Sequence, residues 1–144
     1  YGGTIDAIEA SITNGRKGMM TAQGKNLTPQ EISDVSRHVM ALSEGKEYGP
    51  GKTIYNGKGA CMACHGPDAK GMHALGSVNL TDGILRFAAE DQLASVKYTI
   101  SHGVNDPSDS LTRKAEMPIA GGGKLSETDI KKLAVYVHTL GGGQ

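Results

Sequence analysis

The chain has 144 residues, and its 15 basic and 15 acidic side chains give a formal net charge of zero, which argues against nucleic acid as a partner and against strong long-range steering. Its length fits one ordinary domain or one and a half small ones, and aromatic residues make up only 4%, so the chain has few large rings with which to fill a core. No apolar run approaches the ~20 residues of a membrane span, and no signal peptide is recognisable. Because the first residue is Tyr rather than Met, we expect a fragment or a processed product.

The first predicted helix covers residues 4–13. Its apolar residues fall at helical spacing and Thr4 precedes them as an N-cap, while Asn14 and Gly15 end the helix. The apolar positions are Ile5, Ile8 and Ile12. A loop containing Met19 and Met20 follows.

A second helix is predicted to begin at Thr28. Thr28 is the cap, Pro29 occupies the first helical position, and Glu31 is placed to complete a capping box. The apolar stripe of this helix consists of Ile32, Val35, Val39 and Leu42. Residues 45–52, with three glycines and a proline, form a linker or the lead into a short helix over residues 50–58.

Residues 61–65 read Cys-Met-Ala-Cys-His. This spacing attaches a c-type haem, because the two thiols add to the vinyl groups of haem and the adjacent His65 becomes the proximal iron ligand. A zinc site needs about four ligands, and the chain has only these two cysteines; His73 and His102 lack finger-type spacing. A redox dithiol would require a βαβ context, which is missing from the pattern. The sequence therefore predicts one haem c on Cys61 and Cys64.

The region after this motif begins as a glycine-rich, irregular loop over residues 66–83, as expected around a cofactor. A helix is predicted for residues 90–101, ending at His102 and Gly103, with Leu93, Val96, Tyr98 and Ile100 as its apolar members. After a polar loop over residues 104–116 come Met117 and Pro118. A last helix begins at Ser126, and its apolar stripe consists of Ile130, Leu133, Val137 and Leu140.

A divergent internal repeat connects the two ends of the chain. Residues 27–42 align with residues 125–140, including the cap and the apolar stripe, and residues 8–15 align with residues 96–103. Met20 then corresponds to Met117, after a longer loop in the second copy. The repeat predicts an all-α chain with two domains, in which residues 1–46 are the C-terminal half of a first domain and residues 47–144 are a complete second domain.

The order of these pieces resembles a class I cytochrome c domain over residues 49–144. More closely, the chain resembles the dihaem, membrane-anchored cytochrome c subunit of the cbb-type haem–copper oxidases. The matching pieces are residues 61–66, 76–82, 117–118 and 136–140, and, from the end of that family's first domain, residues 1–3 and 14–20.

The resemblance implies roles for individual residues. Met117, which precedes Pro118, would be the distal iron ligand, with Met72 and His102 as rivals. The carbonyl of Val78, which stands before Asn79 where the family commonly has a proline, would accept a hydrogen bond from His65. Arg86, Lys97 or Tyr98 would meet the haem propionates, whereas Met62, His73 and His138 are expected to have packing or surface roles.

In the amino-terminal half, Met20 would be the distal ligand of a first haem whose attachment motif is absent from this chain. Met19 is its rival, and Thr21 replaces the usual proline. A second haem is therefore expected only in the full-length protein. Because two isolated amphipathic helices are marginal in water, we expect their apolar residues to be covered by the complete domain or by another piece of protein.

The implied function is electron transfer within a cbb-type terminal oxidase in aerobic or microaerobic respiration, without catalysis by this subunit. Its partners would be other oxidase subunits and a donor cytochrome c or cytochrome bc complex. It would lie on the periplasmic side of a bacterial inner membrane, anchored by a segment absent from this chain. The alternatives are a soluble cytochrome c, and a haem gas sensor or peroxidase with a labile distal site.

Overall fold

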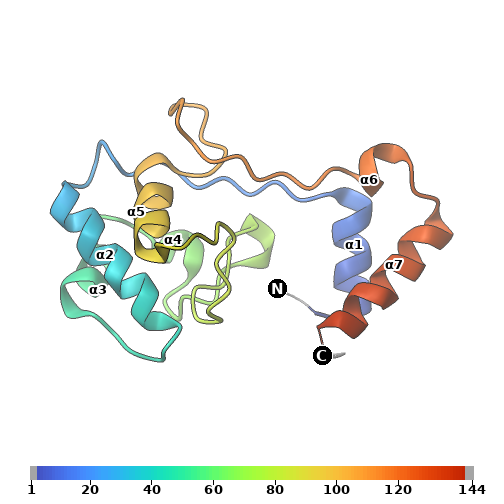
Figure 1. Cartoon of the computed structure of the whole chain (residues 1–144), viewed down its shortest axis with the longest axis horizontal. Helices are drawn as coiled ribbons and strands as arrows, with labels where there is room; N and C mark the ends of the chain where they lie inside the picture. The colour runs from blue at the N-terminus through green and yellow to red at the C-terminus, as the bar shows by residue number, and fades with distance from the viewer. Residues whose placement is uncertain (1–2, 142–144) are drawn as a thin grey trace. The chain divides into compact units, whose positions relative to one another are not determined.

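The computed structural model describes residues 3–141, and the regular structure in that range is helical, with isolated bridges and no strand. The elements are α1 (Ile5–Asn14), α2 (Pro29–Leu42), α3 (Gly49–Asn56), α4 (Met62–His65), the 3₁₀ turn η1 (His73–Leu75), α5 (Gln92–His102), α6 (Ala120–Gly123) and α7 (Glu127–Leu140) (Figure 1). The all-α prediction is confirmed. No helix within the described range has the length and apolar character needed to cross a bilayer.

Side-chain caps start the long helices where the sequence predicts them. The hydroxyl of Thr28 accepts a hydrogen bond from the amide of Glu31 at 3.2 Å, and the Glu31 carboxylate accepts one from the amide of Thr28 at 2.7 Å. Ser126 and Asp129 form the same capping box at the start of α7. Each box satisfies amides that would otherwise lack a partner in the first turn.

The chain divides into two compact units. Residues 18–114 form the first, which we call the haem-motif unit because it contains residues 61–65. Residues up to 17, together with residues from 115 onward, form the second, which we call the helix-pair unit. Neither unit coincides with the predicted domains 1–46 and 47–144. The division into those two domains stays a prediction.

The core of the haem-motif unit lies where α2 packs against α3 and α5. Its buried apolar residues are Leu27, Ile32, Val35, Val39, Tyr55, Ala69, Val96 and Ile100. The predicted stripe of α2 is therefore covered by the part of the chain that carries the motif. Gly51 allows the close approach of α3, because a Cβ there would collide with the carbonyl oxygen of Asp34 and the Cβ of His38.

The helix-pair unit is built from α1 and α7, with α6 against α1. Its small core contains Ile12, Ile130 and Ala134. The predicted stripe of α7 is only partly buried, which corrects the sequence expectation: Leu133, Val137 and Leu140 are 38%, 42% and 68% exposed. One partner helix of ten residues covers only one side of α7.

Candidate haem-binding site

The two cysteines lie on a single helical turn. Cys61 directly precedes α4, and its carbonyl accepts a hydrogen bond from the amide of His65 at 2.9 Å. Residues three apart lie on the same side of a helix, so Cys61 and Cys64 present their thiols together. Burial raises the pKa of the Cys61 thiol to about 11, whereas Cys64 is exposed.

His65 is held by the loop that follows it. Its side chain is buried, and Nδ1 lies 3.0 Å from the carbonyl oxygen of Val78, the contact expected from the resemblance. With its proton on Nδ1, the imidazole donates to this carbonyl and leaves Nε2 for a metal. Burial lowers the pKa of His65, against the opposing effect of the Val78 carbonyl, and so favours the neutral ring that a ligand requires.

Hydrogen bonds fix the loop around this contact. The hydroxyl of Ser77 donates to the carbonyl of Cys64 at 2.5 Å and accepts from the amide of Met72 at 2.7 Å. Gly71 has a φ of +78°, and a Cβ there would meet the carbonyl oxygen of Val78 at 2.7 Å. Asn79, a predicted site residue, uses its side-chain oxygen within the loop, where it accepts from the amide and the hydroxyl of Thr81.

A methionine loop joins the same unit from the amino-terminal side. The amide of Met20 donates to the carbonyl of Val104 at 2.9 Å, and the amide of Val104 donates back to Met20 at 2.9 Å. Met20 is half-buried against the core cluster, next to which Cys61 also packs. Its neighbour Met19 is 63% exposed. The structure thus brings Met20, predicted as a ligand of another haem, into the unit that contains His65.

Met117, the predicted distal ligand of this haem, lies in the helix-pair unit with Pro118. There its amide donates to the carbonyl of Arg16 at 2.8 Å, and the amide of Arg16 donates back at 2.9 Å. Met117 is 37% exposed. The structure therefore groups Met117 with α1 and α7 rather than with the residue predicted to be its partner across the haem.

The other candidates have separate surroundings. His102 places Nδ1 3.1 Å from a carboxylate oxygen of Asp109, and the hydroxyl of Tyr98 donates to the carbonyl of Leu111 at 2.9 Å. In the helix-pair unit, Nδ1 of His138 lies 2.6 Å from the carbonyl oxygen of Gly3. Lys97 is half-buried, and the side chains of Met62, Met72 and Arg86 are exposed. The side chain of His73 lies outside the described part of the chain.

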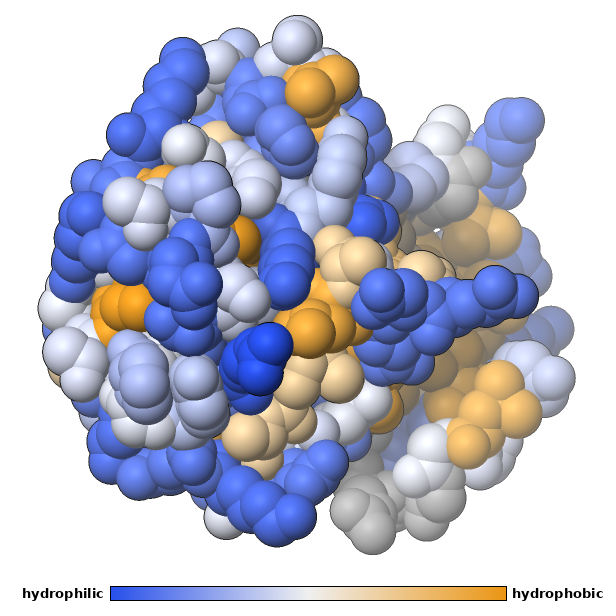
Figure 2. All heavy atoms as spheres, turned by 60° about the vertical axis from the view of Figure 1, so that its left-hand side comes forward, coloured by the Kyte–Doolittle hydropathy of each residue, from blue (hydrophilic) through white to orange (hydrophobic). Residues whose placement is uncertain are grey.

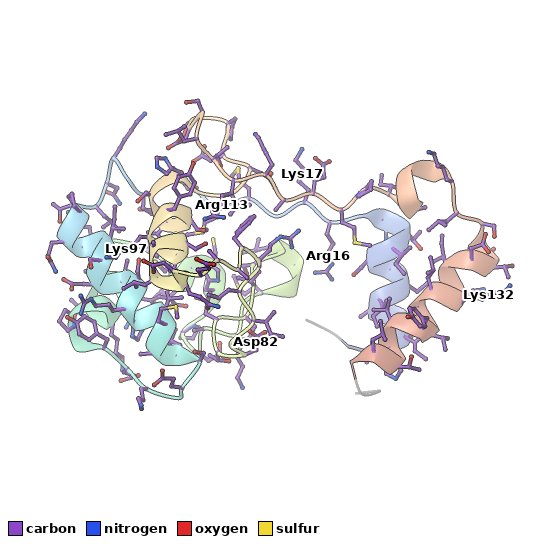
Figure 3. The ribbon with its side chains drawn as sticks, in the orientation of Figure 1. Arg16, Lys17, Asp82, Lys97, Arg113 and Lys132 are labelled. Carbon is purple, nitrogen blue, oxygen red and sulfur yellow. The ribbon has the colours of Figure 1, made fainter. Side chains whose placement is uncertain are left out.

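Sequence reasoning missed Arg113, which belongs to a polar loop without periodicity. Its guanidinium lies over the ring of Phe87 and close to that of Tyr98, at 4.6 and 4.9 Å from the centroids. One terminal nitrogen donates to the hydroxyl of Ser95 on α5 at 2.9 Å. Figure 3 shows Arg113 close to α5. The buried Nε has no hydrogen-bond partner within the described residues.

The donor set of this unit fits a c-type haem. The two thiols are the attachment points, and the oriented imidazole of His65 is a ligand for iron. The buried Nε of Arg113 is a donor for a carboxylate. The same unit exposes large apolar side chains after the first cysteine, among them Met62, Met72, Leu75 and Ile84. The space-filling view likewise shows apolar side chains within a mainly polar face (Figure 2).

Comparisons with known proteins agree with this assignment. The family model for cytochrome c matches residues 49–141. The chain is 40% identical to the cbb3-type cytochrome c oxidase subunit FixP of Azorhizobium caulinodans, with 100% of this chain and 49% of that protein covered. It is 43% identical to subunit CcoP of Rubrivivax gelatinosus, over 97% of this chain and 43% of that protein. Subunit CcoP of Rhodobacter capsulatus is 30% identical over 100% of this chain and 52% of its own length. The chain spans about half the length of these relatives.

Proposed function

Because this chain belongs to the cytochrome c family, we propose that it carries single electrons on one haem c held by Cys61, Cys64 and His65. The observation that carries the proposal is the 3.0 Å contact between His65 Nδ1 and the Val78 carbonyl, directly after the two cysteines. A histidine oriented in this way is a ligand prepared for iron.

When bound, the haem supplies reversible one-electron chemistry at its iron. The residues of the chain attach the haem, orient its histidine ligand and contact its carboxylates. Cys61 and Cys64 would hold the ring through thioether bonds, and Arg113 would be a donor for a haem carboxylate. The Val78 carbonyl orients His65 and favours the tautomer with its proton on Nδ1. A thioether as second axial ligand raises the reduction potential. With His65 and a methionine as its two ligands, the iron would have no position left for a substrate, and the site would only transfer electrons.

In the full-length protein, each methionine would serve the haem that precedes it in the sequence. Met117 would then be the distal ligand of this haem, and Met20 that of a first haem. This assignment rests on the repeat and on the family resemblance, as does the division into domains 1–46 and 47–144. Arg86 and Pro118 belong to the same proposal, as a propionate contact and as the residue that follows the ligand.

The oxidase context is supported by the relatives, which are named as cbb3-type cytochrome c oxidase subunits. On this basis the chain relays electrons from a donor cytochrome c or cytochrome bc complex towards a catalytic oxidase subunit. It does so on the periplasmic side of a bacterial inner membrane and performs no oxygen chemistry itself.

Carbon monoxide binding separates this function from a gas sensor or peroxidase. The reduced, haem-loaded chain is expected to keep its spectrum under carbon monoxide, because both axial positions are filled. A variant with alanine at both Met20 and Met117 is the control and should bind the gas. Rapid binding by the unaltered chain would contradict the proposal and favour an open distal site.

The oxidase connection has its own test. The reduced chain is mixed, in the presence of oxygen, with an oxidase of this type from which the homologous subunit has been removed. We expect oxidation of the chain's haem to require the oxidase and to be faster than that of an unrelated soluble cytochrome c. Equal rates would favour a freely diffusing carrier.

A further inference from the structure

A histidine is buried where α2 packs against α3 in the haem-motif unit. His38 is 3% exposed, and a Cβ at Gly51 of α3 would meet the Cβ of His38 at 2.5 Å. The repeat aligns His38 with Tyr136 of α7, so one copy has an ionisable ring where the other has a tyrosine. Burial of an ionisable side chain is unfavourable unless the side chain is neutral or paired, and the neighbours of His38 show which applies.

A backbone contact assigns a neutral imidazole to His38. The amide of Tyr48, in the linker of residues 43–48 between α2 and α3, donates to Nδ1 of His38 at 3.2 Å. A ring nitrogen that accepts a hydrogen bond carries no proton, so the proton of the neutral ring is on Nε2. Burial lowers the pKa of His38 and outweighs the opposing effect of Glu47. The imidazole therefore ties the linker to α2 for as long as Nδ1 is unprotonated.

The second neighbour of His38 is Tyr55, which contacts both ends of residues 61–65, the haem motif. The rings of His38 and Tyr55 meet edge to face, with centroids 5.6 Å apart and planes at 74°. The carbonyl of Tyr55 accepts a hydrogen bond from the amide of Cys61 at 3.0 Å, and its hydroxyl donates to the carbonyl of Gly66 at 2.8 Å. Because packed side chains transmit displacements, a shift of the imidazole reaches the backbone on both sides of the haem motif.

His38 also lines a cavity of about 140 Å³, whose walls come from α2, the linker, α3 and the loop after the haem motif. The cavity is polar and large enough to hold water. The titratable groups around the imidazole, on its own helix and on the elements packed against it, are Asp34, Glu47, Tyr48, Lys52, Tyr55 and Asp68. Glu47 and Lys52 pair with each other at 2.7 Å. A protonated imidazole therefore has water and carboxylates to turn towards, away from the amide of Tyr48.

We propose that His38 is a positioning residue for the haem motif, and that protonation of its imidazole loosens the frame that α2, the linker and α3 build around this motif. A proton on Nδ1 removes the acceptor of the Tyr48 amide and places two donors face to face, which is unfavourable in a buried position. The ring then turns towards the cavity, and Tyr55 loses its edge-to-face contact. Because Tyr55 holds the backbone at both ends of the haem motif, the orientation of His65 changes as the pH falls.

Nuclear magnetic resonance on the isotope-labelled, oxidised holoprotein tests the proposal without any mutation. The methyl signals of ferric haem depend on the orientation of the histidine ligand, and the nitrogen signals of an imidazole report its protonation. We expect the haem methyl signals and the Tyr48 amide signal to shift with the same midpoint as His38, at a pH below the ordinary histidine value of 6.5. Constant haem methyl signals while His38 titrates, or a His38 that stays neutral until the chain unfolds, would overturn the proposal.

Substitution of His38 by glutamine gives a second measurement. The side-chain oxygen of a glutamine can accept a hydrogen bond from the Tyr48 amide but does not titrate, so His38→Gln should keep the neutral-pH haem signals and lose their acidic shift. His138→Gln is the matched control, because it removes a histidine of the helix-pair unit, and it should retain the acidic shift. An acidic shift of unchanged size in His38→Gln, or its loss in His138→Gln, would refute the role of His38.

The inference rests on the haem attachment proposed above, and the two can fail separately. A chain purified without covalent haem would contradict the proposed function. A chain with covalent haem whose methyl signals do not follow the titration of His38 would leave electron transfer intact and remove only the role of His38.

Discussion

Shortening Val39 to alanine tests whether α2 closes the haem-motif unit. Val39 is 8% exposed within the core cluster. Loss of two buried methyl groups at ~0.8 kcal/mol each, with a further term for the cavity, is expected to lower the free energy of unfolding by about 2 kcal/mol. Val137 is aligned with Val39 in the repeat but is 42% exposed, so Val137→Ala should cost below ~1 kcal/mol.

The assay is urea unfolding of the haem-loaded chain, followed by the Soret band, which reports the haem-motif unit, and by far-ultraviolet circular dichroism. The two substitutions remove the same atoms from aligned positions, so the comparison depends on packing alone. A larger Soret-detected effect for Val137→Ala than for Val39→Ala would refute the packing of α2 against α3 and α5. It would instead favour closure of the unit by α7.

Two further predictions concern the backbone and a buried hydroxyl. Gly103→Ala should destabilise the chain by roughly 2 kcal/mol or more in thermal unfolding, because it combines a positive φ of +68° with a collision against the methionine loop. Tyr55→Phe should cost about 1 kcal/mol at neutral pH, because the Tyr55 hydroxyl donates to the carbonyl of Gly66 at 2.8 Å. Burial raises the pKa of Tyr55 from 10.0 to about 12, so its contribution is full below pH 10 and decreases as the pH rises towards 12.

The Gly103 and Tyr55 predictions each have a control measurement. Gly45 has a φ of +67°, but a Cβ at this position would meet no other atom within 4 Å. Gly45→Ala should therefore lower the free energy of unfolding only by the backbone strain, about 1 kcal/mol. Equal losses at Gly45 and Gly103 would contradict the close approach of the methionine loop. For Tyr55, urea titrations at pH 7, 10 and 11 should show a smaller alkaline loss of stability in Tyr55→Phe than in the unaltered chain. Parallel curves would contradict the raised pKa.

The sequence predicted the elements of this structure better than their partners. Caps such as Thr28 and the spacing of the cysteines act locally, so the helix starts and the motif could be recognised from neighbouring residues. An apolar stripe indicates that one face of a helix is covered but does not specify the covering element. Because residues 18–42 and residues 115–140 carry the same pattern, sequence order assigned Met117 to the haem on Cys61 and Cys64, whereas the unit that contains this motif includes Met20.

Other features left little trace in the sequence. Arg113 lies in a loop without periodicity, and its importance depends on Phe87, Tyr98 and Ser95, which only the fold brings to it. The single-turn helices α4 and α6 are too short for a periodic pattern. In contrast, the Val78 carbonyl was predictable, because its position relative to the cysteines follows the family pattern.

Mass spectrometry of the intact chain, purified from a host that assembles c-type cytochromes, tests the central claim most directly. We predict the mass of the polypeptide plus one haem, and, after proteolysis, that haem on the peptide containing residues 61–65. A chain without covalent haem, a chain with two haems, or a haem attached elsewhere would contradict the account.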